Sequence, residues 1–214
     1  MKSFLVIGVG CGGNNAVDCM IEADMKDVAF IAINGDDYSL KKSHAGKKIS
    51  ISLELKGLGQ IMPEGYAIEA EKKQHEISKA IEGTDIVCIV SCMGGEVGTG
   101  ASPVIAKLAT ELGVKTISLV TMPFRFEGVR RKKRAEEGLI KLKAFSDELY
   151  VVELDELISE KTQIEIFNLS DDTIAPISVT LNKKTGLSLD EAFSSANEAI
   201  CESIYRLISL SEQN

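Results

Sequence analysis

No hydrophobic run in the sequence approaches the roughly 18 residues that a membrane-spanning helix needs. The apolar stretch at residues 4–7 is also too short for the apolar part of a signal peptide, and glycines follow it directly. Low-complexity tracts are absent, and 44% of the 214 residues are hydrophobic while 26% are charged. These features predict a folded, cytoplasmic protein in which residues 1–214 form a single domain.

Histidine is scarce as well, and the 32 acidic residues outnumber the 24 Lys and Arg. The formal net charge of −8 argues against nucleic-acid binding, because phosphate neutralisation by many Lys and Arg supplies most of that affinity. The chain has two histidines and five cysteines, and their spacing matches no metal site. We therefore expect reduced thiols and no protein-held metal, with Cys88 and Cys92 as core residues because they lie in an apolar run.

One short segment is strongly basic. It consists of Arg130, Arg131, Lys132, Lys133 and Arg134, and two glutamates follow at 136 and 137. On a helix such a run faces several directions, so a solvated helix face is the simpler interpretation. Peripheral contact with an anionic membrane is the alternative.

Apolar strands alternate with helical patterns along the first 155 residues. Strands are expected at 3–9, 28–33, 48–53, 85–91, 115–120 and 149–154, and helices after residue 15, at 66–82, at 102–112 and up to about 145. This alternation predicts an α/β fold with a doubly wound, mostly parallel, Rossmann-like sheet. Ligands of such folds bind at the carboxyl edge of the strands.

The alternation breaks after residue 155. Partly alternating segments around a turn-like stretch predict a β-hairpin at about 162–182, within an insertion of about 158–186. It would be either an additional sheet edge or a surface for self-association. A capped helix of about 189–210 follows, with Ser188 and Glu191 placed as in a capping box.

Two glycine-rich loops follow buried strands. The first contains Gly10, Cys11, Gly12, Gly13, Asn14 and Asn15, and the second contains Gly94, Gly95, Glu96, Val97, Gly98, Thr99 and Gly100, before a helix expected from about Ala101. In such turns backbone N–H groups can point at an anion, with the positive end of a helix behind them. We therefore predict a phosphate site, which Asp36 could face from the end of the second strand.

Together these loops resemble the GTP-binding half of the tubulin/FtsZ family. The matching motifs are GCGGNNAV at 10–17, AINGD at 32–36, KGLG at 56–59, MGGEVGTGASP at 93–103, VTMPFRFEG at 120–128 with Arg131, and AFSSANE at 192–198. The resemblance covers about 1–155 and 188–208.

The resemblance implies a site for GTP or GDP, with Mg²⁺ as a candidate companion. Residues 10–15 and 94–100 would hold the phosphates, and Pro123, Glu127 and Arg131 would lie near the ribose and phosphates. Phe193 and Asn197 would lie near the base, and Glu198 would take the two donors on the guanine edge. The resemblance also implies that the chain self-associates or binds an FtsZ-like protein partner, with a role in cell division or membrane remodelling.

The sequence departs from the family pattern at four positions. Glu96 and Val97 replace a glycine and a threonine of the second loop, Glu198 replaces the usual aspartate, and Leu154 replaces an asparagine. Two like charges ~4 Å apart repel by about 1 kcal/mol in water. Glu96 is therefore expected to weaken triphosphate binding unless it turns outward or shares a Mg²⁺ ion.

The acidic loop with which family members complete a neighbour's hydrolytic site has no counterpart in the 214 residues. We accordingly expect little or no GTP hydrolysis. Two other functions stay open: a scaffold with a degenerate pocket, and an NAD-dependent oxidoreductase. Residues 8–13 do match G-x-G-x-x-G, but that reading leaves the second loop unexplained, and the Tyr38-x-x-x-Lys42 pair comes too early for a short-chain dehydrogenase.

Overall fold

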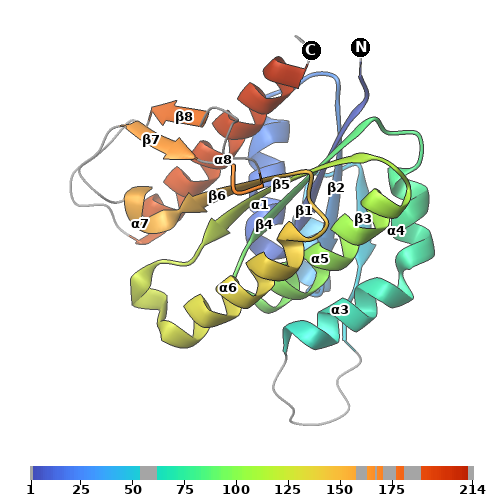
Figure 1. Ribbon diagram of the computed structural model, residues 1–214, viewed down its shortest axis with the longest axis horizontal. Coiled ribbons are helices and arrows are strands. Elements are labelled where there is room, and N and C mark those ends of the chain that lie inside the picture. Colours follow the sequence, from blue (N-terminus) through green and yellow to red (C-terminus); the bar gives the residue numbers. More distant parts are fainter. Residues whose placement is uncertain are drawn as a thin grey trace.

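The computed structural model describes residues 2–53, 62–157, 163–166, 168–170, 177–180 and 189–211. Its centre is a six-stranded, all-parallel sheet in the order β3-β2-β1-β4-β5-β6 (Figure 1). The strands are β1 (Phe4–Val9), β2 (Val28–Asn34), β3 (Lys47–Ser50), β4 (Ile86–Cys92), β5 (Lys115–Met122) and β6 (Glu148–Glu153). The order reverses between β1 and β4, which brings the two loops that follow these strands to one edge of the sheet. The predicted fold class is confirmed.

Helices cover both faces of the sheet because the central strands are apolar on both sides. They are α1 (Gly10–Glu22), α2 (Asp37–Lys42), α3 (Pro63–Lys72), α4 (Gln74–Ile81), α5 (Glu96–Glu111), α6 (Val129–Lys143), α7 (Leu154–Leu157) and α8 (Leu189–Ser211), with a 3₁₀ turn at η1 (Arg125–Glu127). Phe4 and Val6 of β1 pack with α1 and α8. Leu5 and Ile7 pack on the opposite side with α3, α4 and α5. Helix α8 confirms the helix expected at 189–210.

Several boundaries differ from the sequence prediction. The single helix expected at 66–82 is two helices, because Lys73 ends α3 with φ −91° and ψ 8° and its N–H is shared by the carbonyls of Glu69 and Ala70. Helix α5 begins at Glu96 rather than near Ala101. Helix α2, which was not predicted, begins because the Asp36 carboxylate accepts the N–H groups of Tyr38 and Ser39.

The hairpin is confirmed in its paired part. β7 (Gln163–Ile166) and β8 (Ile177–Thr180) are antiparallel. Apart from residues 168–170, the remainder of the predicted insertion lies outside the described residues, as does the KGLG motif. The Asn168 side chain accepts the N–H of Leu149 at 3.2 Å, and its backbone bridges Tyr150. Ile166 and Val179 are buried with α8. The hairpin is therefore fastened to the β6 edge and to the core on the α8 side of the sheet.

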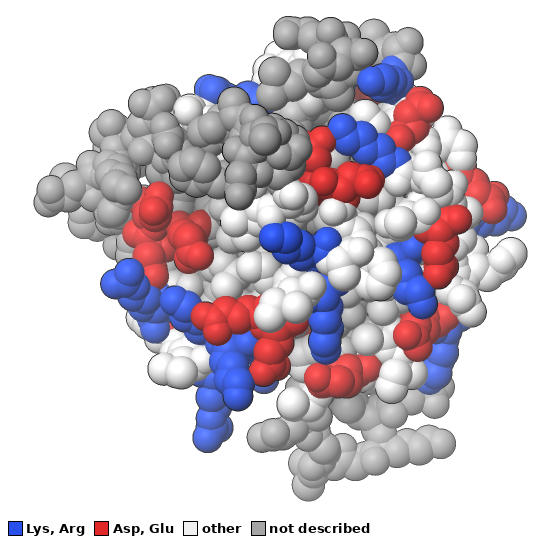
Figure 2. Space-filling model, in the orientation of Figure 1, with Lys and Arg blue, Asp and Glu red and all other residues white. Residues whose placement is uncertain are grey.

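The basic segment is mostly exposed. Arg130, Arg131, Lys132 and Lys133 are exposed and Arg134 is partly buried, and two of these side chains, Arg131 and Arg134, form ion pairs with Glu127 and Glu96. Figure 2 shows basic and acidic side chains interspersed on the visible face, as expected for a solvated surface. Across the part of the chain that the structure describes, no helix combines the length and hydropathy needed to cross a bilayer. Membrane contact through this segment stays a prediction.

Candidate functional site

The first glycine loop places the start of α1 at the carboxyl edge of the sheet. Gly10 follows β1 with φ +74°, a conformation that favours glycine. A Cβ on Gly13 would lie 2.3 Å from the backbone oxygen of Val90 in β4. Only glycine at that position lets α1 lie so close to β4. The N-terminal N–H groups of α1 therefore lie beside the carboxyl edge of the sheet.

Asn14 supports this loop from inside the fold. The side chain is buried, and its amide, oriented to satisfy its neighbours, donates to Gly8 O at 2.9 Å and Gly10 O at 3.2 Å and accepts from Asn34 at 3.1 Å. Asp36 serves as the N-cap of α2, and the Ser39 hydroxyl holds the pKa of the Asp36 carboxyl below its ordinary value. Both residues were predicted to face a ligand, and the structure gives both a role in holding loops.

The second loop is shorter than the seven-residue turn expected from the sequence. Gly94 has φ +91° and its N–H is accepted by Thr99 Oγ1 at 2.8 Å, inside the loop. Gly98 and Gly100 lie within α5, where a Cβ would be 2.7 Å from Cys92 O and 2.0 Å from Pro63 O. These glycines permit close packing at the start of α5, which leaves Gly95, Glu96, Val97 and Gly98 to line the open space in front of it.

Two adjoining cavities lie at this edge. The first, of about 180 Å³, is lined by Val9, Gly10, Cys11, Gly12, Cys92, Gly95, Glu96, Val97, Gly98 and Arg131. The second, of about 240 Å³, is lined by Gly12, Asn15, Cys92, Thr121, Arg131, Leu154, Phe193, Ala196, Asn197 and Ile200. Each is smaller than the roughly 300 Å³ at the low end of ligand pockets. Because their linings share Gly12, Cys92 and Arg131, the two cavities adjoin each other, and we call them together the crevice.

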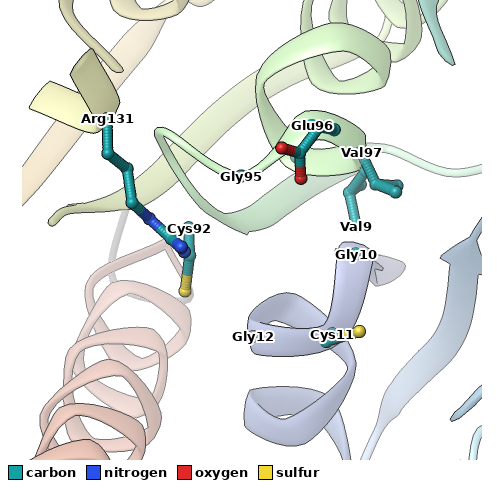
Figure 3. A pocket seen from close by; sticks show the side chains of 10 residues that line it. Val9, Gly10, Cys11, Gly12, Cys92, Gly95, Glu96, Val97 and Arg131 are labelled. Atoms are coloured by element: carbon teal, nitrogen blue, oxygen red, sulfur yellow. The ribbon is translucent and has the colours of Figure 1, made fainter. Parts of the chain in front are cut away.

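The first cavity has the features of an anion site. It lies between the N-terminal ends of α1 and α5 (Figure 3), whose unpaired N–H groups and dipoles favour negative charge. The Arg131 side chain reaches from α6 toward Cys92 in the same view. Glu127 orients it, since its carboxylate lies 3.0 Å from Arg131 Nε and accepts the Phe124 N–H at 2.9 Å.

The second cavity combines a flat ring with amides. Phe193 of α8 packs edge-on against Phe124, with centroids 5.4 Å apart and an interplanar angle of 81°. Asn15 and Asn197 add amide groups to the lining. A planar heterocycle with polar edges fits such a wall.

Glu198 is exposed on α8 and lines neither cavity. It lies beside α1, where its charge opposes ionisation of Cys19. In this structure the Glu198 carboxylate therefore lies near Cys19 of α1 and is not part of the crevice lining.

The crevice brings together part of the predicted site. Predicted residues that line it are Gly10, Cys11, Gly12, Asn15, Gly95, Glu96, Val97, Gly98, Arg131, Phe193 and Asn197. Predicted residues outside its lining are Gly13, Asn14, Asp36, Gly94, Thr99, Gly100, Pro123, Glu127 and Glu198.

Sequence reasoning missed Cys92, which was assigned to the core. Its thiol faces the crevice (Figure 3), and burial raises its pKa. The available signal was its position as the last residue of a central parallel strand, where side chains reach the ligand-binding edge. Thr121 of β5 lines the crevice from the equivalent end of the neighbouring strand.

Comparisons with known proteins agree with this geometry. The family model described as the Tubulin/FtsZ family, GTPase domain, matches residues 3–161. The cell division protein FtsZ of Mycoplasmopsis pulmonis is 46% identical over 156 residues, which are 72% of this chain and 40% of that protein. FtsZ of Buchnera aphidicola is 38% identical over 197 residues, which are 91% of this chain and 46% of that protein.

Solved structures show the same fold. An empty FtsZ dimer from M. jannaschii superimposes with a TM-score of 0.81 at 30% identity, covering 98% of this chain and 55% of that one. CetZ2 from Haloferax volcanii, at 23% identity and a TM-score of 0.76, shares the fold. The chain spans about half the length of the relatives it matches. On the family match and these identities, the chain belongs to the tubulin/FtsZ family of GTPase domains.

Proposed function

We propose that the crevice binds a guanine nucleotide, GDP or GTP. The observation that carries this proposal is that two unlike cavities adjoin at the same edge of the sheet. One end offers helix N-termini and Arg131 to phosphates, and the other offers Phe193 and Asn197 to a base. The family's GTPase assignment supports the same ligand class.

Glu198 would provide the preference for guanine. Guanine presents two adjacent donors, N1–H and the 2-amino group, which one carboxylate can accept together, whereas adenine lacks this pair. The side chain lies on α8 one residue beyond Asn197, which lines the base end of the crevice. The proposal requires this exposed glutamate to turn toward the base when the nucleotide binds.

Isothermal titration calorimetry with GDP, GTP, ATP and NAD tests the proposal. We expect binding of at least one guanine nucleotide and much weaker binding of ATP and NAD. Binding of NAD alone would favour the oxidoreductase. Failure of all four ligands to bind would favour the scaffold with a degenerate pocket.

We also propose that the chain self-associates, in cell division or membrane remodelling. The M. jannaschii relative was solved as a dimer, and the curated relatives are cell division proteins. Light scattering and electron microscopy with and without GTP would detect filaments. The expectation of little or no GTP hydrolysis stays a prediction, which phosphate release measured at increasing protein concentration would check.

Mg²⁺ is compatible with the residues at the first cavity. Mg²⁺ commonly binds through one or two carboxylates together with substrate phosphates, and Glu96 is the carboxylate in the described lining. When bound, the ion would neutralise phosphate charge. Arg134 holds Glu96 by an ion pair, so this carboxylate is already engaged.

A further inference from the structure

Glu96 places a carboxylate inside the first cavity. It is the first residue of α5 and lines the cavity, with its side chain 42% exposed. Arg134 of α6 holds it from outside the lining, with Nη1 2.7 Å from Glu96 Oε1. The same Nη1 donates to Gly94 O at 3.3 Å, so the arginine is fastened at two points.

The position of Glu96 along the crevice is defined by the shared lining. Phe193 and Asn197 lie at one end, Arg131 and Gly12 lie in the stretch common to both cavities, and Glu96 and Val97 lie at the other end. A nucleotide with its base against Phe193 would place its first phosphates in the common stretch. The third phosphate of a triphosphate would then enter the part bordered by Glu96 and Val97.

That terminal part is poorly suited to additional negative charge. Val97 brings an apolar side chain, which packs toward Gly10 and has no hydroxyl to donate. Glu96 adds a charge of the same sign as the phosphate, at the helix end whose N–H groups and dipole would otherwise attract an anion. Arg134 offsets only part of the negative charge of Glu96, because the ion pair is partly exposed and water screens it.

We propose that Glu96, positioned by Arg134, makes this site select the diphosphate over the triphosphate of the bound nucleoside. This inference rests on the proposed guanine-nucleotide function and adds a specificity-determining pair to it. Without Glu96, the start of α5 would attract a third phosphate. With it, the third phosphate meets a carboxylate whose ion pair already engages Arg134.

The test is calorimetric titration of GDP and GTP, in EDTA, into the full chain and three variants. Two unit charges at contact distance in water change a dissociation constant by about fivefold. We expect the unsubstituted chain to bind GDP at least about fivefold more tightly than GTP. Glu96→Gln, which is nearly isosteric, should remove most of this preference. Arg134→Gln should increase it, because Glu96 then lacks its counter-charge.

Glu111→Gln is the matched control. Glu111 is also a partly exposed carboxylate of α5 in an ion pair, with Lys107 at 3.8 Å, but it lies at the opposite end of the helix. Its removal should leave the ratio of GDP to GTP affinity unchanged.

Two results would overturn the inference alone. One is a GDP to GTP affinity ratio near one in the unsubstituted chain that Glu96→Gln does not alter. The other is a gain in GTP affinity on adding Mg²⁺ that disappears in Glu96→Gln, because Glu96 would then favour the triphosphate through the metal. If the unsubstituted chain binds neither nucleotide, the proposed function itself fails and this inference fails with it.

Discussion

At the scale of single residues, the glycines of the two loops have two different roles. Gly10 and Gly94 adopt positive φ angles, which the loop geometry requires. Gly13, Gly98 and Gly100 instead allow backbone segments to approach closely. The sequence predicted that both loops matter, but it could not separate these roles, because they depend on which neighbouring strand or helix each Cα faces.

Gly13→Ala is predicted to destabilise the fold. The added methyl group would lie 2.3 Å from Val90 O, a backbone atom of the central strand that cannot move aside cheaply. Overpacking of this kind costs about 1–3 kcal/mol. Urea unfolding would measure the loss. Gly46→Ala is the control, since its Cβ would meet nothing within 4 Å; an equal loss in both variants would contradict the packing role of Gly13.

Arg131→Gln is predicted to weaken guanine-nucleotide binding. Its side chain lines both cavities, and hydrogen bonds to charged groups contribute about 1.5–3 kcal/mol, which corresponds to roughly ten- to 150-fold in affinity. The neighbouring Arg130 is exposed and outside both linings. Calorimetry with GDP should therefore show a large loss for Arg131→Gln and almost none for Arg130→Gln. Similar losses in the two variants would indicate a diffuse charge effect.

At the scale of elements, the strands were easier to predict than the helix starts. Near-continuous apolar runs identify β1, β4 and β5 without ambiguity. The first five residues of α5 include two glycines and a valine, which have low helix propensity, so sequence reasoning placed the start five residues too late. Close packing against β4 and α3 overrides that propensity. Thr99 was consequently expected in a loop, whereas it lies in the helix and holds Gly94.

Helix α8 is predicted to depend on its buried face. Ile204 is fully buried in the core shared with α1, so Ile204→Ala should cost about 2–5 kcal/mol in the free energy of unfolding. Tyr205, the next residue, is 61% exposed. Tyr205→Ala should change stability by less than about 0.5 kcal/mol. Denaturant unfolding of both variants would measure the difference, and a stable Ile204→Ala variant would show that α8 is not docked as described.

The contact between α1 and α8 also predicts a pH dependence. The Cys201 thiol donates a hydrogen bond that lowers the pKa of Cys19 to about 7. Because the thiolate is the reactive form, alkylation of Cys19 by iodoacetamide should reach half its maximal rate near pH 7 rather than near 9. Cys201→Ala should move this midpoint upward, and Cys201→Ser, which keeps a donor, should move it less. Mass spectrometry of the Cys19 peptide would follow the reaction, and a midpoint unaffected by Cys201→Ala would contradict the contact.

At the scale of the whole molecule, the sheet order explains why distant motifs form one site. The switch between β1 and β4 brings the starts of α1 and α5 together, and α8 closes the crevice from the end of the described chain. Alternating strands and helices predicted this arrangement. The direction of Glu198 and the pairing of Glu96 with Arg134 could not be predicted, because both depend on how α6 and α8 lie against the sheet.

A crystal structure of the chain with GDP tests the central claim most directly. We predict phosphate oxygens about 3 Å from backbone nitrogens at the starts of α1 and α5. The base should lie against Phe193, with the Glu198 carboxylate turned onto the guanine edge. A nucleotide bound outside the crevice, or a base with Glu198 directed away from it, would contradict the account.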